Sequence, residues 1–287
     1  MSHTPDSTSI AIIGSGTLGS QIAFTLAAFG NYKVKIFDTN FQALQQARER
    51  IHGWISSIKS EGGPAIEEAR LSDLLTMASS LEEAVSAVEL IIEAIPEDLA
   101  MKRDLFARMS PLAPKAILAS NSSSIQSRCL ADVTVDPQRL LNAHFYLEPW
   151  KRNPVELMSC GQTDPDVMLR TAEILKTAKL DPILLRKEST GLLFNRIWRS
   201  VKRECLRVIA EGVGKPEEID KMWRVNFGTT IGPCQMMDMI GLDVVLAIER
   251  IYSSESPDPT DVPPAFLEEW VRNGKLGKKT GEGFYRY

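Results

Sequence analysis

The chain has 287 residues, of which 44% are hydrophobic and 24% charged, so it can bury a large core and is not wholly disordered. Its formal net charge of -4 gives no support for nucleic-acid binding, and no apolar run approaches the ~18 residues that span a bilayer. The four cysteines show no CxxC spacing, which argues against a metal site or a disulfide framework and favours a reducing compartment. Residues 1–9 lack the basic and apolar regions of a secretory signal. We therefore expect a cytoplasmic protein with no membrane or nucleic-acid partner.

Short apolar segments alternate with longer amphipathic ones along the first 190 residues. We predict strands at residues 10–13, 34–37, 90–95, 116–119, 140–145, 155–158 and 182–185. We predict helices at residues 17–29, 41–59, 99–112 and 165–179, and a short helix after the capping-box sequence of residues 80–83. This alternation is typical of a Rossmann-type α/β domain, with a mostly parallel sheet and helices on both faces.

The pattern changes after Lys187, where apolar residues recur every four positions from Leu193 to Ile209. That spacing predicts a helix, and Pro216 is placed to begin another. Further helices are expected at residues 236–252 and 265–272, and we predict no strand in this part. The sequence therefore predicts two domains, a sheet domain at residues 1–187 and an all-α domain at residues 188–287.

A glycine-rich turn follows the first predicted strand, where Gly14, Gly16 and Gly19 fit G-x-G-x-x-G. In this motif the first glycine permits a tight turn, the second lets the backbone approach a pyrophosphate, and the third lets a helix pack on the sheet. Asp38 ends the second strand 19 residues later, where a carboxylate can bind ribose hydroxyls and would repel the 2′-phosphate of NADP. The motif therefore predicts NAD as cofactor. The alternative role of Asp38 is that of a residue in the first turn of a helix.

Histidine chemistry has few candidates, because the chain contains only His3, His52 and His144. His144 directly follows the apolar run 140–143, and strand ends border the ligand crevice of an open α/β sheet. A neutral imidazole suits general-base catalysis near pH 7. Glu156 comes twelve residues later in another apolar run, and a hairpin would bring it beside His144 as the orienting carboxylate. The alternatives are a structural His144 and a Glu156 on the surface of an edge strand.

Several separated motifs carry a resemblance to a known family. They are residues 12–19 (IIGSGTLG), 93–97 (EAIPE), 120–124 (SNSSS), 144–145 (HF), 155–156 (VE), 191–196 (GLLFNR), 231–233 (IGP) and 277–285 (GKKTGEGFY). With these motifs in this order, the chain resembles the L-3-hydroxyacyl-CoA dehydrogenase family along nearly its whole length. The resemblance implies a homodimer formed by the helical domain.

The resemblance also implies roles for individual residues. His144 matches the catalytic histidine, Glu156 the carboxylate that orients it, Ser123 the serine that binds the reacting oxygen, and Asn195 an asparagine on the substrate side. To the glycines and Asp38 it adds, as cofactor-binding residues, Thr17, Leu18, Ala94, Ile95, Glu97, Lys102, Asn121 and Lys279. The alternatives are a helix cap for Ser123, a turn or helix-surface position for Asn195, and a solvated charge for Lys279.

Two segments depart from the family pattern. After the His-Phe pair, Leu147 stands where the family has an asparagine, and residues 148–152 (EPWKR) add bulk and charge. In residues 50–63, where the family carries a lysine-rich patch that meets CoA, Lys59 is the only lysine and Trp54 replaces a small hydroxyl residue. CoA phosphates bind lysine and arginine, so these changes leave open whether the substrate carries CoA. The altered loop is either a remodelled surface or a changed substrate pocket.

Three functions remain open at this point. The first is an NAD-dependent oxidoreductase that interconverts a 3-hydroxyacyl-CoA thioester and its 3-keto form, with His144 as the acid or base. The second is an NAD-dependent dehydrogenase or reductase of a CoA-free 3-hydroxy or 3-keto compound. The third is a non-catalytic dinucleotide-binding protein, against which the presence of His144, Glu156, Ser123 and Asn195 together counts strongly.

Overall fold

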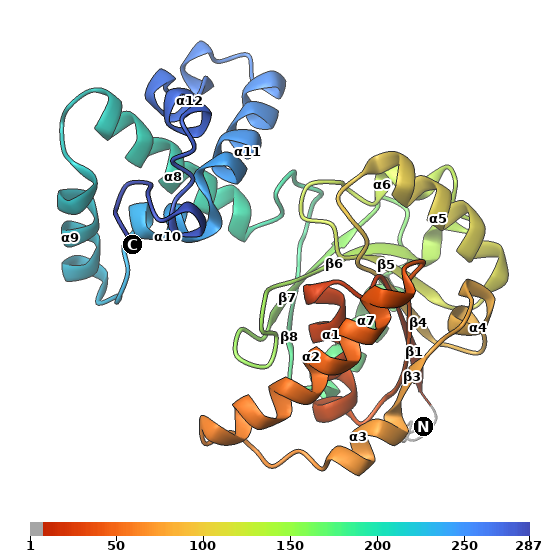
Figure 1. Cartoon of the computed structure of the whole chain (residues 1–287). Coiled ribbons are helices and arrows are strands. Elements are labelled where there is room, and N and C mark those ends of the chain that lie inside the picture. The colour runs from red at the N-terminus through yellow and green to blue at the C-terminus, as the bar shows by residue number, and fades with distance from the viewer. Residues whose placement is uncertain (1–7) are drawn as a thin grey trace. The chain divides into compact units, whose positions relative to one another are not determined.

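The computed structural model describes residues 8–287, apart from the side chains of Glu255 and Pro259, and it divides into two units between Leu193 and Phe194 (Figure 1). The sequence placed this boundary near Lys187. Residues 1–7, which open the predicted first domain and include His3, lie outside the described residues. Within residues 8–287, none of the helices is both long enough and apolar enough to cross a membrane.

The first unit is built on one eight-stranded sheet with the order β3-β2-β1-β4-β5-β6-β7-β8. Its strands are β1 (Ser9–Ile13), β2 (Lys33–Phe37), β3 (Leu75–Met77), β4 (Leu90–Glu93), β5 (Ile117–Ser120), β6 (Leu140–Phe145), β7 (Pro154–Ser159) and β8 (Asp181–Leu184). All neighbouring strands are parallel except β6 and β7, which pair antiparallel. The predicted Rossmann-type, mostly parallel sheet is confirmed. Strand β3 was not predicted, because three residues are too few to show a strand period.

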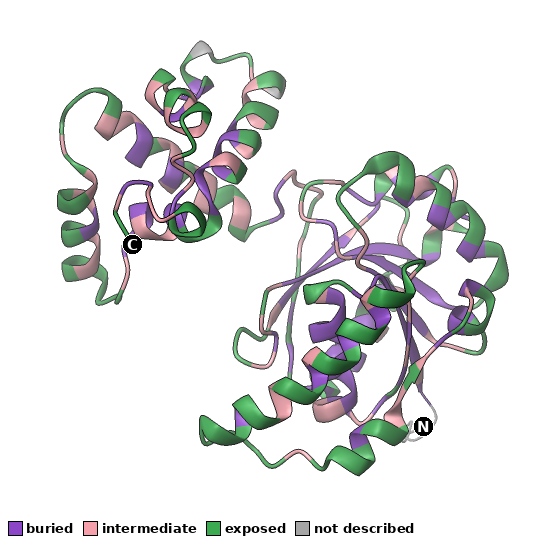
Figure 2. Cartoon of the chain, viewed as in Figure 1, coloured by how far each residue is buried: buried purple, intermediate pink, exposed green. Residues whose placement is uncertain are grey.

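Helices cover both faces of the sheet, as the alternation predicted (Figure 1). Ile10 and Ile12 of β1 belong to the core with α1 (Thr17–Gly30), α2 (Phe41–Ser60), α3 (Glu68–Leu74) and α7 (Pro165–Thr177). Ala11 and Ile13 belong to the opposite core with α4 (Leu81–Val85), α5 (Leu99–Leu112) and α6 (Arg128–Ala131). Figure 2 shows the central strands buried between these layers. Because side chains alternate along a strand, one continuous apolar run supplies both cores.

Side-chain caps fix where several helices begin. The Asn40 side chain accepts the backbone N–H of Gln42 at 3.0 Å before α2, and the Ser80 hydroxyl accepts that of Glu83 at 3.1 Å before α4. The Glu83 carboxylate accepts the backbone N–H of Ser79 at 2.7 Å. A complete capping box would have Glu83 accept the backbone N–H of Ser80, the N-cap residue. Glu83 binds the residue before it, so only half of the expected box forms.

The second unit is helical. Its elements are α8 (Phe194–Ala210), α9 (Pro216–Phe227), α10 (Pro233–Ile240), α11 (Leu242–Glu255), α12 (Ala265–Arg272) and the short 3₁₀ helices η3 (Pro259–Asp261) and η4 (Lys278–Thr280). The single helix expected at residues 236–252 was wrong. Gly241, with φ at 105°, breaks it into α10 and α11, and only glycine adopts that backbone conformation readily.

Two buried aspartates hold the end of the chain onto this unit. Asp238 accepts the backbone N–H groups of Phe284 and Tyr285, each at 2.9 Å. Asp220 accepts the backbone N–H of Cys234 at 2.8 Å and the hydroxyl of Tyr285 at 2.8 Å. The C-terminal motif of residues 277–285 therefore has a structural task in this unit, since it supplies partners to carboxylates that would otherwise be buried and unpaired.

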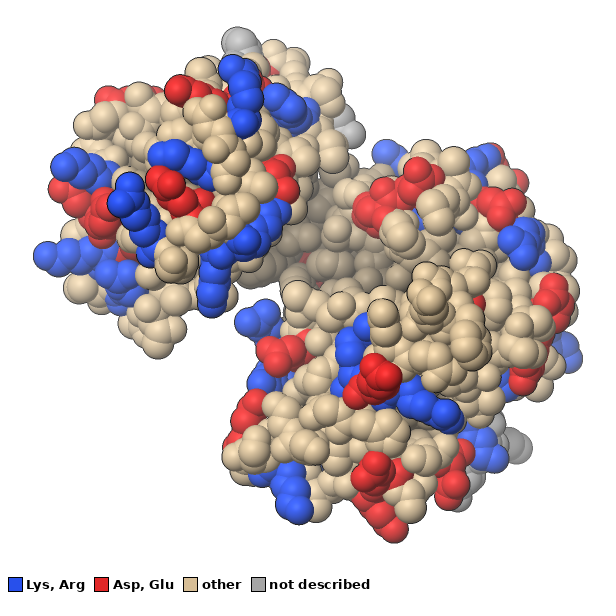
Figure 3. All heavy atoms as spheres, viewed as in Figure 1, with Lys and Arg blue, Asp and Glu red and all other residues tan. Residues whose placement is uncertain are grey.

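On the face of the protein shown in Figure 3, acidic and basic side chains are interspersed over each unit. That face presents no extended basic stripe of the kind that follows a phosphate backbone.

Candidate active site

The glycine-rich turn lies at the point in the sheet where the strand order reverses, between the carboxyl ends of β1 and β4. Open α/β sheets bind ligands in the crevice at such a switch point. Gly14 has φ at 106°, and a β-carbon there would lie 2.6 Å from the carbonyl oxygen of Ala94, which follows β4. A β-carbon on Gly19 would lie 2.0 Å from the carbonyl oxygen of Gly14, whereas one on Gly16 would have no atom within 4 Å. The turn therefore packs tightly on its inner side and leaves open space above Gly16, as a pyrophosphate requires.

The residues that begin α1 are open to solvent on the same side. Gly16 and Thr17 are exposed and Leu18 is half-buried, while the helix behind them is buried from Gly19 to Ala27. The first N–H groups of a helix have no partner within the helix, and they carry the positive end of its dipole. This N-terminus therefore presents donors where a phosphate can reach them.

Asp38 holds the glycine-rich turn from the end of β2. One carboxylate oxygen accepts the backbone N–H of Ser15 at 2.8 Å and its hydroxyl at 2.9 Å. The other accepts the backbone N–H of Asn40 at 2.9 Å, so Asp38 also has the alternative role in a helix-starting turn. From α2, Arg50 donates to the carbonyl of Ser15 at 2.6 Å. Sequence reasoning missed Ser15 and Arg50, because the variable positions of the motif and a distant helix carry no local signal.

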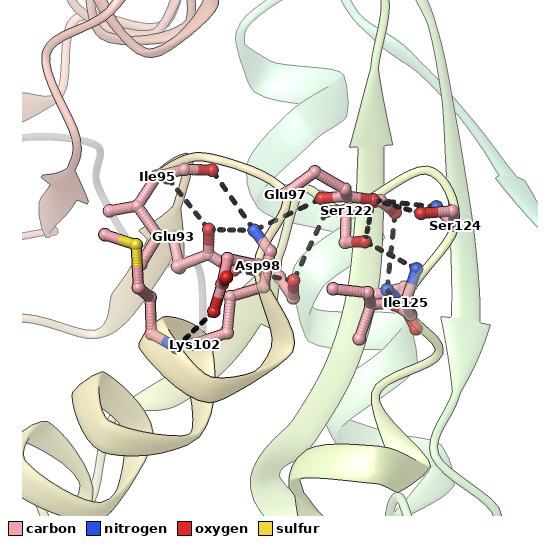
Figure 4. A network of polar contacts seen from close by, with 11 residues as sticks. Glu93, Ile95, Glu97, Asp98, Lys102, Ser122, Ser124 and Ile125 are labelled. Atoms are coloured by element: carbon pink, nitrogen blue, oxygen red, sulfur yellow. Dashed lines mark hydrogen bonds and ion pairs between the residues drawn. The ribbon is translucent and has the colours of Figure 1, made fainter. Parts of the chain in front are cut away.

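A buried ion pair lies at the carboxyl end of β4 (Figure 4). The ammonium group of Lys102, on α5, lies 2.5 Å from Glu93 and 3.4 Å from Glu97, and it donates to the carbonyl of Ile95 at 3.2 Å. The second oxygen of Glu93 accepts the hydroxyl of Ser120 at 2.7 Å. Burial raises the pKa of the Glu93 carboxyl, and Lys102 opposes that rise. The pairing of Glu97 with Lys102 brings two predicted site residues together. Glu93, which also binds Lys102, was not predicted as a site residue.

Glu97 reaches from the β4–α5 connection to the loop after β5 (Figure 4). It accepts the hydroxyls of Ser122 at 2.5 Å and Ser124 at 2.7 Å, and the backbone N–H of Ser124 at 2.9 Å. Burial acts to raise the pKa of Glu97, but these hydrogen bonds bring it below its usual value. Ser123 lies between the two serines, and its hydroxyl has no hydrogen-bond partner among the residues that the structure describes.

Two asparagines tie this loop and β5 to β6. The side chain of Asn121 accepts the backbone N–H of Phe145 at 2.8 Å. The side chain of Asn142, on β6, accepts the backbone N–H of Ser127 at 2.7 Å and donates to the carbonyl of Ile125 at 3.1 Å. The segment that carries Ser123 is therefore attached to the same strand as His144.

His144 and Glu156 are direct partners across the antiparallel pairing of β6 and β7. The imidazole Nδ1 lies 3.0 Å from Oε2 of Glu156, and the two side chains are 8% and 2% exposed. The other oxygen of Glu156 accepts the backbone N–H of Leu193 at 2.7 Å. In the described part of the chain, the imidazole Nε2 has no hydrogen-bond partner. The pair is thus a histidine oriented by a carboxylate, with its second nitrogen available to a ligand.

Tyr146 is a third member of this group that sequence reasoning missed. Its hydroxyl donates to the same Oε2 of Glu156 at 2.7 Å, and its ring contacts that of His144 edge-on at 4.8 Å between centroids. Burial and the carboxylate of Glu156 raise the pKa of the Tyr146 hydroxyl. The only signal in the sequence was an aromatic residue two positions after His144, and that pattern does not show where a hydroxyl points.

The two segments that depart from the family pattern, residues 50–63 and 147–152, contact each other. Trp150, in the β6–β7 loop, packs against Trp54 of α2 with ring centroids 5.4 Å apart, and both contact Phe24 of α1 at 5.2 and 5.7 Å. Lys151 adds an ion pair to Glu61 at 2.9 Å. We call Phe24, Trp54 and Trp150 the aromatic clamp. The altered loop is therefore packed against α2 rather than free in solvent.

Two predicted residues lie in the second unit. Asn195 is half-buried in the first turn of α8. Lys279 lies in η4, and its ammonium group is 2.5 Å from the carboxylate of Asp243. That hydrogen bond holds the pKa of Asp243 below its usual value. Lys279 is exposed as well as paired with this carboxylate, so the pairing does not exclude the alternative of a solvated charge.

Comparison with known proteins gives consistent results over the full chain. The model of the 3-hydroxyacyl-CoA dehydrogenase NAD-binding domain matches residues 9–189, and that of the C-terminal domain of the same enzymes matches residues 191–287. A probable 3-hydroxybutyryl-CoA dehydrogenase of Bacillus subtilis is 32% identical, over 97% of this chain and 96% of the relative.

Two solved structures are similar throughout. The (S)-3-hydroxybutyryl-CoA dehydrogenase of Ralstonia eutropha has a TM-score of 0.90 and 30% identity, over 97% of this chain and 98% of its own. A diketoreductase described as acting on dicarbonyl compounds has a TM-score of 0.86 and 34% identity, over 98% of this chain and 99% of its own.

The surroundings of the two glycines predict that the same substitution reduces stability at Gly19 and cofactor binding at Gly16. Gly19→Ala should lower the free energy of unfolding by about 1–3 kcal/mol, because its β-carbon meets backbone that cannot move aside. Gly16→Ala should leave the melting temperature unchanged, yet raise the Kd of NADH about tenfold or more, equivalent to about 1.4 kcal/mol. Thermal unfolding and NADH fluorescence titration measure the two effects. A Gly16→Ala variant that binds NADH as wild type does would contradict the assignment of this turn.

Proposed function

The chain belongs to the 3-hydroxyacyl-CoA dehydrogenase family, and from that premise we propose that His144 and Glu156 are the acid–base pair of this NAD-dependent oxidoreductase. The observation that carries the proposal is the 3.0 Å contact between Nδ1 of His144 and Glu156, which leaves Nε2 free. The reaction is the interconversion of a 3-hydroxy compound and its 3-keto form.

In the oxidising direction, Nε2 of His144 takes the proton of the substrate hydroxyl. Glu156 holds the proton of Nδ1, which fixes the tautomer with a free Nε2, and its charge stabilises the imidazolium that forms. Bound NAD supplies the hydride acceptor. In the reducing direction, His144 begins protonated and gives its proton to the oxygen of the keto group. General acid–base catalysis of this kind contributes roughly 10²–10⁴-fold to the rate.

Ser123 and Asn195 are proposed to hold the reacting oxygen. Two observations support the role of Ser123. Its hydroxyl has no partner among the described residues, and the serines on either side of it, Ser122 and Ser124, bind Glu97. Asn195 follows Leu193, whose N–H binds Glu156, by two residues. For NAD, we propose contacts from the turn at Gly14 to Gly19, from Asp38 and from Lys279. We add Ala94, Ile95, Glu97, Lys102 and Asn121, which follow β4 and β5 at the same edge of the sheet.

A 3-hydroxyacyl-CoA thioester is the substrate class that the named relatives favour, since several are 3-hydroxybutyryl-CoA dehydrogenases. A second candidate is a CoA-free dicarbonyl or 3-keto compound. Two observations favour it: the similarity to a diketoreductase, and the aromatic clamp on α2 in place of a lysine-rich patch.

We also propose that the protein is a homodimer. Large apolar side chains on and beside α9 are exposed, and this supports self-association of the helical unit. They are Val213 (73%), Met222 (62%), Val225 (73%) and Phe227 (66%).

One assay separates the two substrate classes. We expect kcat/KM for NADH oxidation with acetoacetyl-CoA to exceed that with CoA-free 3-keto acids and diketo esters by about tenfold or more. The reason is that several of the named relatives are 3-hydroxybutyryl-CoA dehydrogenases. The N-acetylcysteamine thioester of acetoacetate is the matched control, since it keeps the thioester and lacks the nucleotide. Faster turnover of a diketo ester than of acetoacetyl-CoA would replace the first candidate with the second.

His144→Ala should reduce kcat by roughly 10²–10⁴-fold. NADH binding should be retained, because the imidazole lies outside the glycine-rich turn. The melting temperature should fall, because the variant removes one partner of the buried Glu156 carboxylate. His52→Ala is the control, since His52 is exposed and paired with Glu68 on α3. Full turnover by the His144→Ala variant would refute the acid–base assignment.

Sedimentation velocity should give about twice the 31.9 kDa mass of one chain. Val225→Glu should shift the mass toward that of one chain, because a buried, unpaired carboxylate is costly in an apolar interface. Thr260→Glu, at another exposed position of the same unit, serves as control. A wild-type protein that sediments as a monomer at micromolar concentration argues against the dimer.

A further inference from the structure

We propose that Tyr146 is a positioning residue whose hydroxyl shares the Glu156 carboxylate with His144 and so weakens the hydrogen bond between Glu156 and His144. Tyr146 thereby sets how readily His144 takes up and releases its proton. The inference rests on the proposed function, in which His144 is the acid or base. It concerns a residue to which the proposed proton transfer gives no part.

The geometry places two donors on one oxygen. Oε2 of Glu156 accepts the hydroxyl of Tyr146 at 2.7 Å and faces Nδ1 of His144 at 3.0 Å, while Oε1 accepts the N–H of Leu193 at 2.7 Å. The carboxylate is 2% exposed, so protein groups take the place of bulk water as its hydrogen-bond partners. Each donor stabilises the negative charge and leaves less of it available to the others.

Tyr146 cannot easily turn away from this position, because the backbone on both sides of it is fixed. Asn121 binds the N–H of Phe145 at 2.8 Å, and Gln21 binds the N–H of Glu148 at 2.9 Å. Trp150 then anchors the loop in the aromatic clamp. The Tyr146 hydroxyl is also neutral at working pH, because burial and Glu156 raise its pKa. It therefore acts on Glu156 as a permanent donor.

The sign of the effect follows from this arrangement. An imidazolium is stabilised by the charge of its carboxylate partner, so a donor that shares the carboxylate lowers the pKa of the histidine. Removal of the Tyr146 hydroxyl should therefore raise the pKa of His144. His144 would then remain protonated to higher pH, and the pH at which it becomes a base would move upward.

Other charged groups near these strands are the same in wild type and variant. On the side of β4 and α5, Lys102 pairs with Glu93 and Glu97. On the segment after β8, Glu188 pairs with Arg128 at 3.6 Å, and Arg186 and Lys187 come directly before Glu188 in the chain. The next charged residue along the chain after Leu193 is Arg196. A comparison of two proteins that differ only at Tyr146 holds all these contributions constant.

The test is a titration of His144 by NMR in the full-length protein, with Tyr146→Phe as the variant. The chain has three histidines, so three imidazole signals are expected, and His144→Gln identifies the signal of His144. We expect the pKa of His144 to rise by roughly half a unit to one unit, where one unit corresponds to tenfold in the protonation equilibrium. The midpoint of the pH profile of kcat should move in the same direction.

Tyr32→Phe is the matched control, because it removes another buried hydroxyl of the same unit, which donates to the carbonyl of Ile174 at 3.1 Å. It should leave the pKa of His144 unchanged. An unchanged or lowered pKa of His144 in Tyr146→Phe overturns the proposal. The titration needs no turnover, so a protein inactive on every 3-keto compound would refute the proposed function and still yield this result.

A second variant covers the case in which Tyr146→Phe fails to fold. Incorporation of 3-fluorotyrosine at position 146 retains the ring and makes the hydroxyl a stronger donor. The pKa of His144 should then fall below the wild-type value. A rise in that pKa would contradict the proposal as directly as an unchanged value in the phenylalanine variant.

Discussion

The antiparallel pairing of β6 with β7 is the constraint on which the candidate site depends. It sets His144 opposite Glu156, in a sheet whose other neighbouring strands are all parallel. A shift of one residue in this register would send Glu156 to the opposite face of the sheet. The imidazole, the hydroxyl of Tyr146 and the N–H of Leu193 are among the partners that compensate the burial of this carboxylate. The same pairing therefore organises both the local fold and the chemistry.

Carboxylates with several hydrogen-bond partners organise the connections around this site. Asp38 fastens the glycine-rich turn through Ser15, and Glu97 fastens the loop after β5 through two serines. Glu93 is held by Lys102 and Ser120. In each case the acid binds backbone or hydroxyl groups of a segment distant in sequence. Loops that carry the predicted cofactor contacts are thus held in part by charge-assisted hydrogen bonds.

The mostly parallel sheet, the glycine-rich turn and the contact of His144 with Glu156 follow patterns that are visible in the sequence, because each has a local period or a fixed spacing. The break at Gly241 was missed, since a glycine in an otherwise helical pattern does not reveal its own φ. Tyr146, Arg50 and Glu93 were missed for a different reason. Their roles depend on which partner the tertiary fold brings to them, and nothing in their neighbouring residues specifies that partner.

The aromatic clamp joins two positions that lie 96 residues apart in the chain, Trp54 and Trp150. Each indole is the packing surface of the other, so replacement of one alone leaves a void or an exposed ring at its partner. We therefore expect sequences descended from this one to change the two positions together. A β6–β7 loop transplanted from a relative would need the matching residue of α2 to travel with it.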